Sequence, residues 1–216
     1  MNLFSKQASG PYKNEGFNAI YNLLFCDDIE LYKAKHSSPA IYPWNDLFAR
    51  EIDTVKMQEI MHDETLETRP KILAGNLLLK KGIIPPQKDL LAVVVEVGLE
   101  NGLDVIAAYK DGNARYINHS EKMIIWETKT DQSAALINQL FFEGEKIVTQ
   151  IGPWDKPRRP APGKDMVRIN FLVSDGLYFG EGPFDFLSRD QMGGPIIAAA
   201  EALMTFLIDQ QIGRNN

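Results

Sequence analysis

The stretch from Leu90 to Glu127 constrains the fold more than any other part of the chain. It reads LLAVVVEVGLENGLDVIAAYKDGNARYINHSEKMIIWE, with apolar and β-branched runs separated by turn signals. Asn101-Gly102 and Asp111-Gly112 both suit tight hairpins, because Asn, Asp and Gly tolerate positive φ. A looser turn is expected at residues 118–121. The stretch therefore predicts four consecutive antiparallel strands.

The two tight turns also predict a register. If each is a two-residue loop, Val97 lies opposite Ile106 and Ala107 lies opposite Tyr116. Because side chains alternate between the faces of a sheet, one face then carries only aliphatic residues. The other face combines small and polar residues, namely Val94, Glu96, Gly98, Val105, Ala107, Tyr109, Ala114 and Tyr116.

This second face is the predicted ligand site, with Glu96, Tyr109 and Tyr116 as its binding residues. The small residues leave room above the sheet, and the carboxylate and phenols supply polar groups for a small polar ligand. A Glu among apolar neighbours has a raised pKa, as general acid–base catalysis often requires. The same pattern also fits a face covered by a packed helix, with Glu96 reaching water at the strand end.

The N-terminal part of the chain has helical patterns. Apolar residues repeat at helical spacing from Phe17 to Tyr32, with Asp28 as a break, and residues 1–14 are expected to be a loose arm. Asn45 or Asp46 is expected to cap the next helix, and a further helix is predicted from Pro70 to Gly82. We therefore expect a mainly helical segment at residues 1–84.

The rest of the chain mixes strands and helices. A helix capped by Thr130 or Asp131 is expected to end at Gly152, and the proline-rich residues 154–165 are expected to be irregular. Strands follow at 166–173 and 177–180, and a last helix runs from 193 to 212. The predicted fold is α+β: a single domain, 1–216, in which helices cover an antiparallel meander sheet of about six strands within residues 87–212.

Composition narrows the function classes. Among 216 residues, 44% are hydrophobic and 24% charged, and the net charge of −6 disfavours nucleic-acid binding. The single cysteine, Cys26, fits a reducing compartment. The N-terminus lacks a signal-peptide pattern, and the apolar window Pro195 to Ile208 is expected to be too short for a membrane span. A cytoplasmic protein with no membrane or nucleic-acid partner is expected.

Weaker site hypotheses lie in the later half. Gly193 and Gly194 open the last helix, where free amides suit an anion, although helix initiation explains them equally well. Arg158 and Arg159 lie in the basic loop and are candidates for binding an acidic partner, with a solvated linker as the alternative. No metal or cofactor is expected, because Glu59 and His62 lack the second such pair that a carboxylate-bridged metal site requires.

Function is the least determined property of this sequence. We find no nucleophile–base arrangement, which favours a non-catalytic ligand-binding or protein-assembly module over an enzyme. In the last helix, Ala198, Glu201, Ala202, Thr205 and Asp209 form a small and polar stripe that suits either solvent or a homodimer contact. The alternative function is an enzyme that uses a buried Glu96 as general acid or base.

Overall fold

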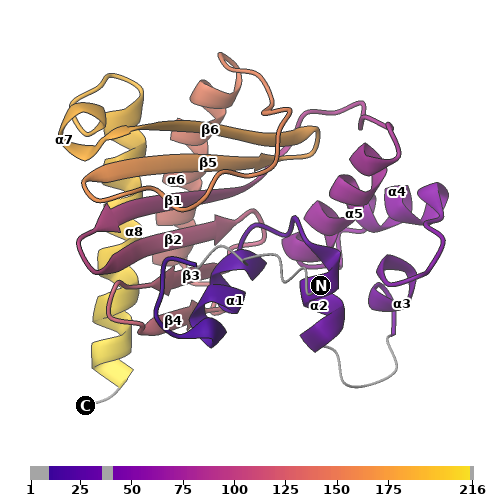
Figure 1. The fold of residues 1–216 in the computed structure, drawn as a ribbon, viewed down its shortest axis with the longest axis horizontal. Helices are drawn as coiled ribbons and strands as arrows, with labels where there is room; N and C mark the ends of the chain where they lie inside the picture. Colours follow the sequence, from indigo (N-terminus) through magenta and orange to yellow (C-terminus); the bar gives the residue numbers. More distant parts are fainter. Residues whose placement is uncertain (1–9, 36–40, 215–216) are drawn as a thin grey trace, which may run out of the picture.

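The computed structural model describes residues 10–35 and 41–214, which form a six-stranded antiparallel sheet and the helices that pack against it. Figure 1 shows α6 and α8 behind the sheet and α1 in front of it. The strand order is β4-β3-β2-β1-β5-β6, which confirms the predicted α+β class. The strands are β1 (Leu90–Leu99), β2 (Gly102–Tyr109), β3 (Ala114–Ile117), β4 (Met123–Trp126), β5 (Met166–Val173) and β6 (Gly176–Pro183). The helices are α1 (Glu15–Leu23), α2 (Ile29–Lys35), α3 (Trp44–Leu47), α4 (Thr54–His62), α5 (Thr68–Lys80), α6 (Asp131–Val148), α7 (Phe184–Leu187) and α8 (Gly193–Arg214).

One face of the sheet, called the back face, packs against α6 and α8 (Figure 1). Thr130 caps α6 as expected, with its side chain accepting a hydrogen bond from the Ser133 amide. Gly144 lies on the buried side of α6, where an added Cβ would be 3.1 Å from Leu90 and 3.2 Å from Phe171. The missing side chain therefore lets α6 approach the sheet closely.

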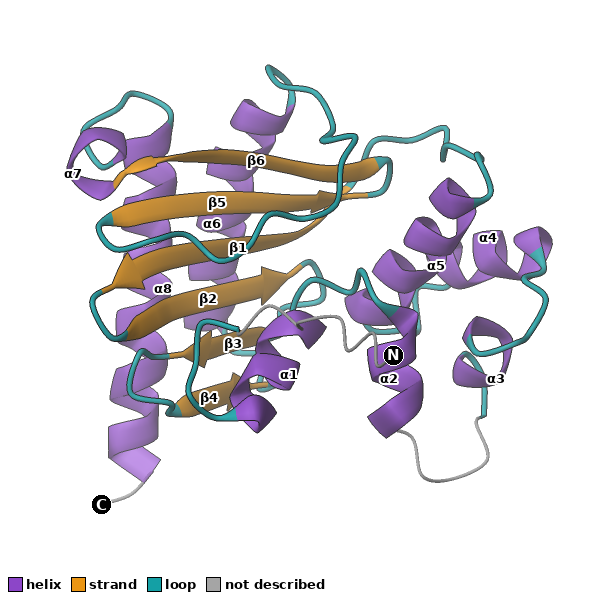
Figure 2. Ribbon diagram, in the orientation of Figure 1, coloured by secondary structure: helices purple, strands orange, loops and turns teal. Residues whose placement is uncertain are grey.

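The opposite face, called the front face, packs against the N-terminal helices. A second hydrophobic cluster joins residues of α1, α4 and α5 to front-face residues of β1, β2 and β3. Residues 154–165, called the strap, cross this face as a loop without helix or strand, as predicted (Figure 2). The two faces therefore have separate cores and different cover.

The predicted register was wrong in both tight hairpins. Leu99 pairs with Gly102, so the first turn has Glu100 and Asn101 at its tip and is displaced by two residues from the prediction. A displacement of two leaves every side chain of β2 on its predicted face.

The second hairpin is displaced by one residue, which has a larger consequence. Tyr109 pairs through its amide with the Asn113 carbonyl, so the loop has three residues, with Gly112 at a φ of +89°. Tyr116 then pairs with Ile106 instead of Ala107. Each side chain of β3 therefore lies on the opposite face of the sheet from the predicted one.

Several predicted helix boundaries needed correction. The helix expected from Asn45 or Asp46 is two helices, α3 and α4, and Asp53 caps the second. The short helix α7 was not predicted. Residues 10–14 do not form a loose arm, because the buried Tyr12 donates a hydrogen bond to the Leu103 carbonyl at 2.9 Å. Residues 1–9 of the predicted arm lie outside the described part of the chain.

Helix α8 is longer than its apolar window suggested. Among the described residues it is the one helix long and apolar enough to cross a membrane, with a mean hydropathy of 1.2 over Gly193–Gly213. The expectation that this segment is too short was therefore wrong. Its apolar side, including Ile196, Leu203 and Leu207, is buried in the back-face core.

Candidate functional site

The corrected register separates the three residues of the predicted ligand site. Glu96 and Tyr109 lie on the front face, whereas Tyr116 lies on the back face opposite Ile106. The Tyr109 side chain is 1% exposed, and its hydroxyl donates to the Leu24 carbonyl at 2.9 Å. Because a sheet separates Tyr116 from the other two side chains, the three do not line one pocket.

Glu96 is fully buried under α1. Tyr21 donates a hydrogen bond to Glu96 Oε1 at 2.6 Å, and the Asn170 side chain donates one to Oε2 at 2.7 Å. The Arg168 guanidinium lies 3.7 Å from Oε2. The structure is therefore closer to the second alternative for this face, in which a packed helix covers it. That alternative assumed that Glu96 reaches water, and it does not.

Burial of Glu96 raises the pKa of its carboxyl above the ordinary value, because a charged form loses its hydration there. The hydrogen bonds from Tyr21 and Asn170 and the positive charge of Arg168 act in the opposite direction, and burial outweighs them. A raised pKa is compatible with general acid–base chemistry. The enclosed geometry, in which both oxygens already have donors, is equally that of a structural polar cluster.

The space that Gly98 leaves on the front face is filled by the strap. A Cβ on Gly98 would lie only 2.0 Å from the Gly163 carbonyl oxygen. The Asp165 amide donates to the Gly98 carbonyl at 2.9 Å, which fixes the strap against β1. The small residue was correctly interpreted as making room, and a segment of the same chain occupies that room.

The basic residues of the strap are bound within the chain. Arg158 Nε donates to Asp27 at 2.7 Å, and the guanidinium stacks 3.9 Å from the Phe25 ring. Arg159 forms an ion pair with Glu181 at 3.0 Å. Both arginines therefore anchor the strap to the rest of the fold, and their binding to another protein stays a prediction.

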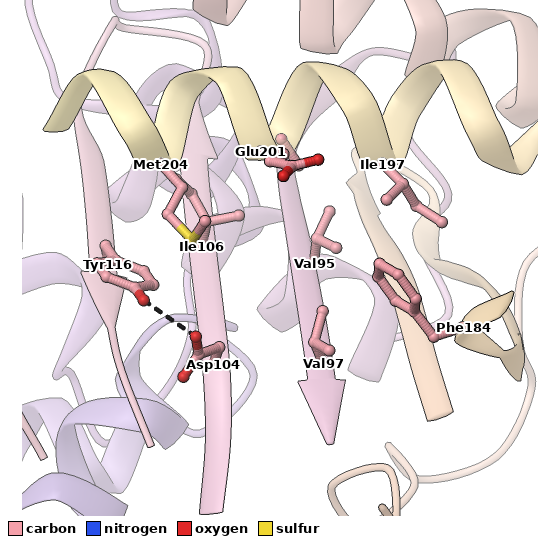
Figure 3. A pocket seen from close by; sticks show the side chains of 10 residues that line it. Val95, Val97, Asp104, Ile106, Tyr116, Phe184, Ile197, Glu201 and Met204 are labelled. Carbon is pink, nitrogen blue, oxygen red and sulfur yellow. Dashed lines mark hydrogen bonds between the residues drawn. The ribbon is translucent and has the colours of Figure 1, made fainter. Parts of the chain in front are cut away.

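The back face contains a cavity between the sheet and α8 (Figure 3). Its volume is about 170 Å³, and ten described residues line it. Three of them are polar, namely Asp104 from β2, Tyr116 from β3 and Glu201 from α8. The other lining residues are apolar, namely Val95, Val97, Ile106, Phe184, Ile197, Ala200 and Met204.

Asp104 organises the polar side of this cavity. Tyr116 donates its hydroxyl proton to Asp104 Oδ2 at 3.0 Å, as Figure 3 shows. The His119 amide donates to Oδ1 at 2.7 Å, and His119 Nδ1 lies 2.9 Å from the same oxygen. Burial beside Asp104 raises the pKa of the Tyr116 phenol, which therefore stays neutral and keeps its proton for Asp104.

The glycines at the start of α8 are already engaged. The Gly193 amide donates to Asp190 Oδ1 at 2.8 Å, and the Gly194 amide donates to the Asp190 carbonyl at 2.9 Å. Hydrogen bonds from the Gly193 and Met192 amides to the Asp190 carboxyl lower its pKa. Helix initiation therefore accounts for both glycines, and anion binding there stays a prediction.

The described residues offer no constellation for metal or thiol chemistry. In residues 10–35 and 41–214, no group of three or more His, Cys, Asp or Glu side chains is arranged to hold a metal ion. Burial raises the pKa of the Cys26 thiol to about 12, so the thiolate needed for nucleophilic attack is scarce at neutral pH.

Sequence reasoning missed Asp104 and the part that Glu201 plays in the cavity. Alternation alone places Asp104 on the face of Ile106, because the two are separated by one residue, so this signal was present in the sequence. Glu201 was correctly expected to be exposed on α8. That Glu201 lines the same cavity as Asp104 and Tyr116 depends on how α8 crosses the sheet, which no local pattern encodes.

No protein-family model matches the sequence, and no curated protein is significantly similar to it.

Proposed function

We propose that this chain is a non-catalytic binding module that holds a small, mainly apolar molecule in the cavity between α8 and the back face. The observation that supports the proposal best is the cavity itself, which combines seven apolar side chains with three polar ones. A cavity of about 150 Å³ accepts benzene in another protein, so 170 Å³ suits a molecule of comparable size. This ligand is more apolar than the polar one expected from Glu96, Tyr109 and Tyr116.

The alternative, an enzyme with Glu96 as general acid or base, has less support. A catalytic carboxyl must reach a substrate proton within about 3 Å. Both Glu96 oxygens instead accept hydrogen bonds from Tyr21 and Asn170, and the residue is 0% exposed.

The test is a binding titration with indole, followed by amide chemical shifts. We expect shifts concentrated on β1, β2 and α8 and a Kd of about 1 mM or tighter, as befits a ligand with few atoms. Ala200→Met extends a side chain from the buried side of α8 and should abolish these shifts. The matched control is Ala202→Met, because Ala202 lies on the exposed side of the same helix.

Two outcomes would contradict the proposal. One is the absence of saturable shifts up to about 10 mM indole. The other is saturable binding that Ala200→Met and Ala202→Met affect equally, because the ligand would then lie elsewhere.

The homodimer and the cytoplasmic location remain proposals. Ala198, Ala202 and Thr205 are exposed on α8, where a second copy would find a surface of small residues. Sedimentation at tens of micromolar would contradict the dimer if it showed only monomers.

A further inference from the structure

The charged side chains that line the back-face cavity indicate which charge a ligand should carry. Of the ten described residues that line it, two are carboxylates and none is Lys or Arg. Asp104 extends from β2 and Glu201 from α8, so the two acids approach the cavity from its opposite walls (Figure 3). The lining thus carries negative charge at two points and no positive charge.

The two carboxylates differ in how far their own fold satisfies them. Asp104 accepts the Tyr116 hydroxyl on one oxygen and two His119 nitrogens lie against the other. Those contacts hold its side chain in one position. Because a carboxylate has about four acceptor sites, Asp104 can still accept a hydrogen bond from a ligand. Glu201 is exposed, and no hydrogen bond or ion pair joins it to the described residues. One acid is thus pre-positioned and the other is available.

We propose that the ligand of this cavity is a small amphipathic amine, with its apolar part between β1, β2 and α8 and its ammonium group between Asp104 and Glu201. This inference deepens the binding function proposed above and depends on it. An ammonium group supplies donors to both carboxylates, and charge-assisted hydrogen bonds are about twice as strong as neutral ones. The apolar walls suit a ring or short alkyl body and would exclude a more hydrated cation.

The test compares benzylamine with benzyl alcohol, which has the same number of heavy atoms and no charge. At pH 8 and low salt we expect benzylamine to bind at least about tenfold more tightly, and benzoate to bind more weakly than either. Glu201→Gln should remove most of this preference while leaving the affinity for benzyl alcohol unchanged. Because Glu201 is exposed, this variant is expected to fold normally.

Asp209→Asn is the matched control, since it removes the same charge from the exposed side of α8 at a residue that does not line the cavity. It should leave the preference for the amine intact. Asp104→Asn gives a second measurement inside the cavity and should lower affinity for benzylamine more than for benzyl alcohol.

The outcomes separate the two proposals. If benzyl alcohol binds in the cavity and benzylamine binds no more tightly, the amine inference is overturned and the binding function stands. An equal loss of preference in Glu201→Gln and Asp209→Asn would also overturn it, because the effect would be one of net charge. If neither compound binds, both proposals fail.

Discussion

The two faces of the sheet use polar residues in opposite ways. On the front face, Glu96 is surrounded by donors from α1 and β5, and the strap fills the space above Gly98. On the back face, Asp104 and Glu201 border unfilled space. The difference shows that a buried carboxyl with a raised pKa is poor evidence of a binding site unless there is space for a ligand beside it. We therefore interpret the front-face cluster as structural and keep the back-face cavity as the proposed ligand site.

The largest effect expected from this comparison is that of Glu96→Ala. The change leaves the Tyr21 hydroxyl without its acceptor, leaves the Asn170 side-chain amide with only the Val94 carbonyl, and creates a cavity. We expect the free energy of unfolding to fall by about 2–4 kcal/mol, measured by urea denaturation. Glu100→Ala, at the exposed hairpin tip, should change it by less than about 0.5 kcal/mol. A similarly small effect of Glu96→Ala would contradict the structural role of the cluster.

Gly98→Ala tests whether the strap is packed tightly on the front face. Its Cβ would collide with the Gly163 carbonyl, so the strap must move away from β1. A loss of about 1–3 kcal/mol in the free energy of unfolding is expected from such overpacking. The matched control is Gly180→Ala in β6, where an added Cβ meets nothing within 4 Å. Equal stabilities of the two variants would show that the strap yields without cost.

The pH dependence of stability should reveal the smallest of these effects. Because the folded-state pKa of Glu96 is raised, the native protein binds this proton more tightly than the unfolded chain. Its contribution to the free energy of unfolding is therefore full below the ordinary value of 4.5 and is lost as pH rises through the folded-state value. Glu96→Gln cannot ionise, so the stability of wild type relative to this variant should decline from pH 4 upward.

Urea denaturation of both proteins between pH 4 and 8 measures this difference, with Glu100→Gln as an exposed control. If the stability of wild type relative to Glu96→Gln increased with pH, Arg168 and the hydrogen bonds would lower the pKa of Glu96 by more than burial raises it. In that case the front-face carboxylate would be a stabilising ion-pair partner throughout the neutral range.

The sequence by itself determined the elements and much of their packing. The apolar run from Leu90 to Val95 predicted a strand, and Thr130 predicted the start of α6. The exposed stripe of α8 was also predictable, because helical periodicity assigns a side chain to a face without reference to the rest of the fold.

Only the tertiary structure decided which residues share a site. Asp111-Gly112 suits both a two-residue and a three-residue loop, and one extra residue exchanges the faces of β3. Here the Asp111 side chain accepts a hydrogen bond from the Thr68 amide at 2.7 Å, and Thr68 belongs to distant α5. The three-residue loop placed Tyr116 beside Asp104 and away from Glu96, and the crossing of α8 over the sheet brought Glu201 to the same cavity. A local pattern encodes alternation, whereas the number of residues in a loop and the place where helices cross depend on contacts between segments far apart in the chain.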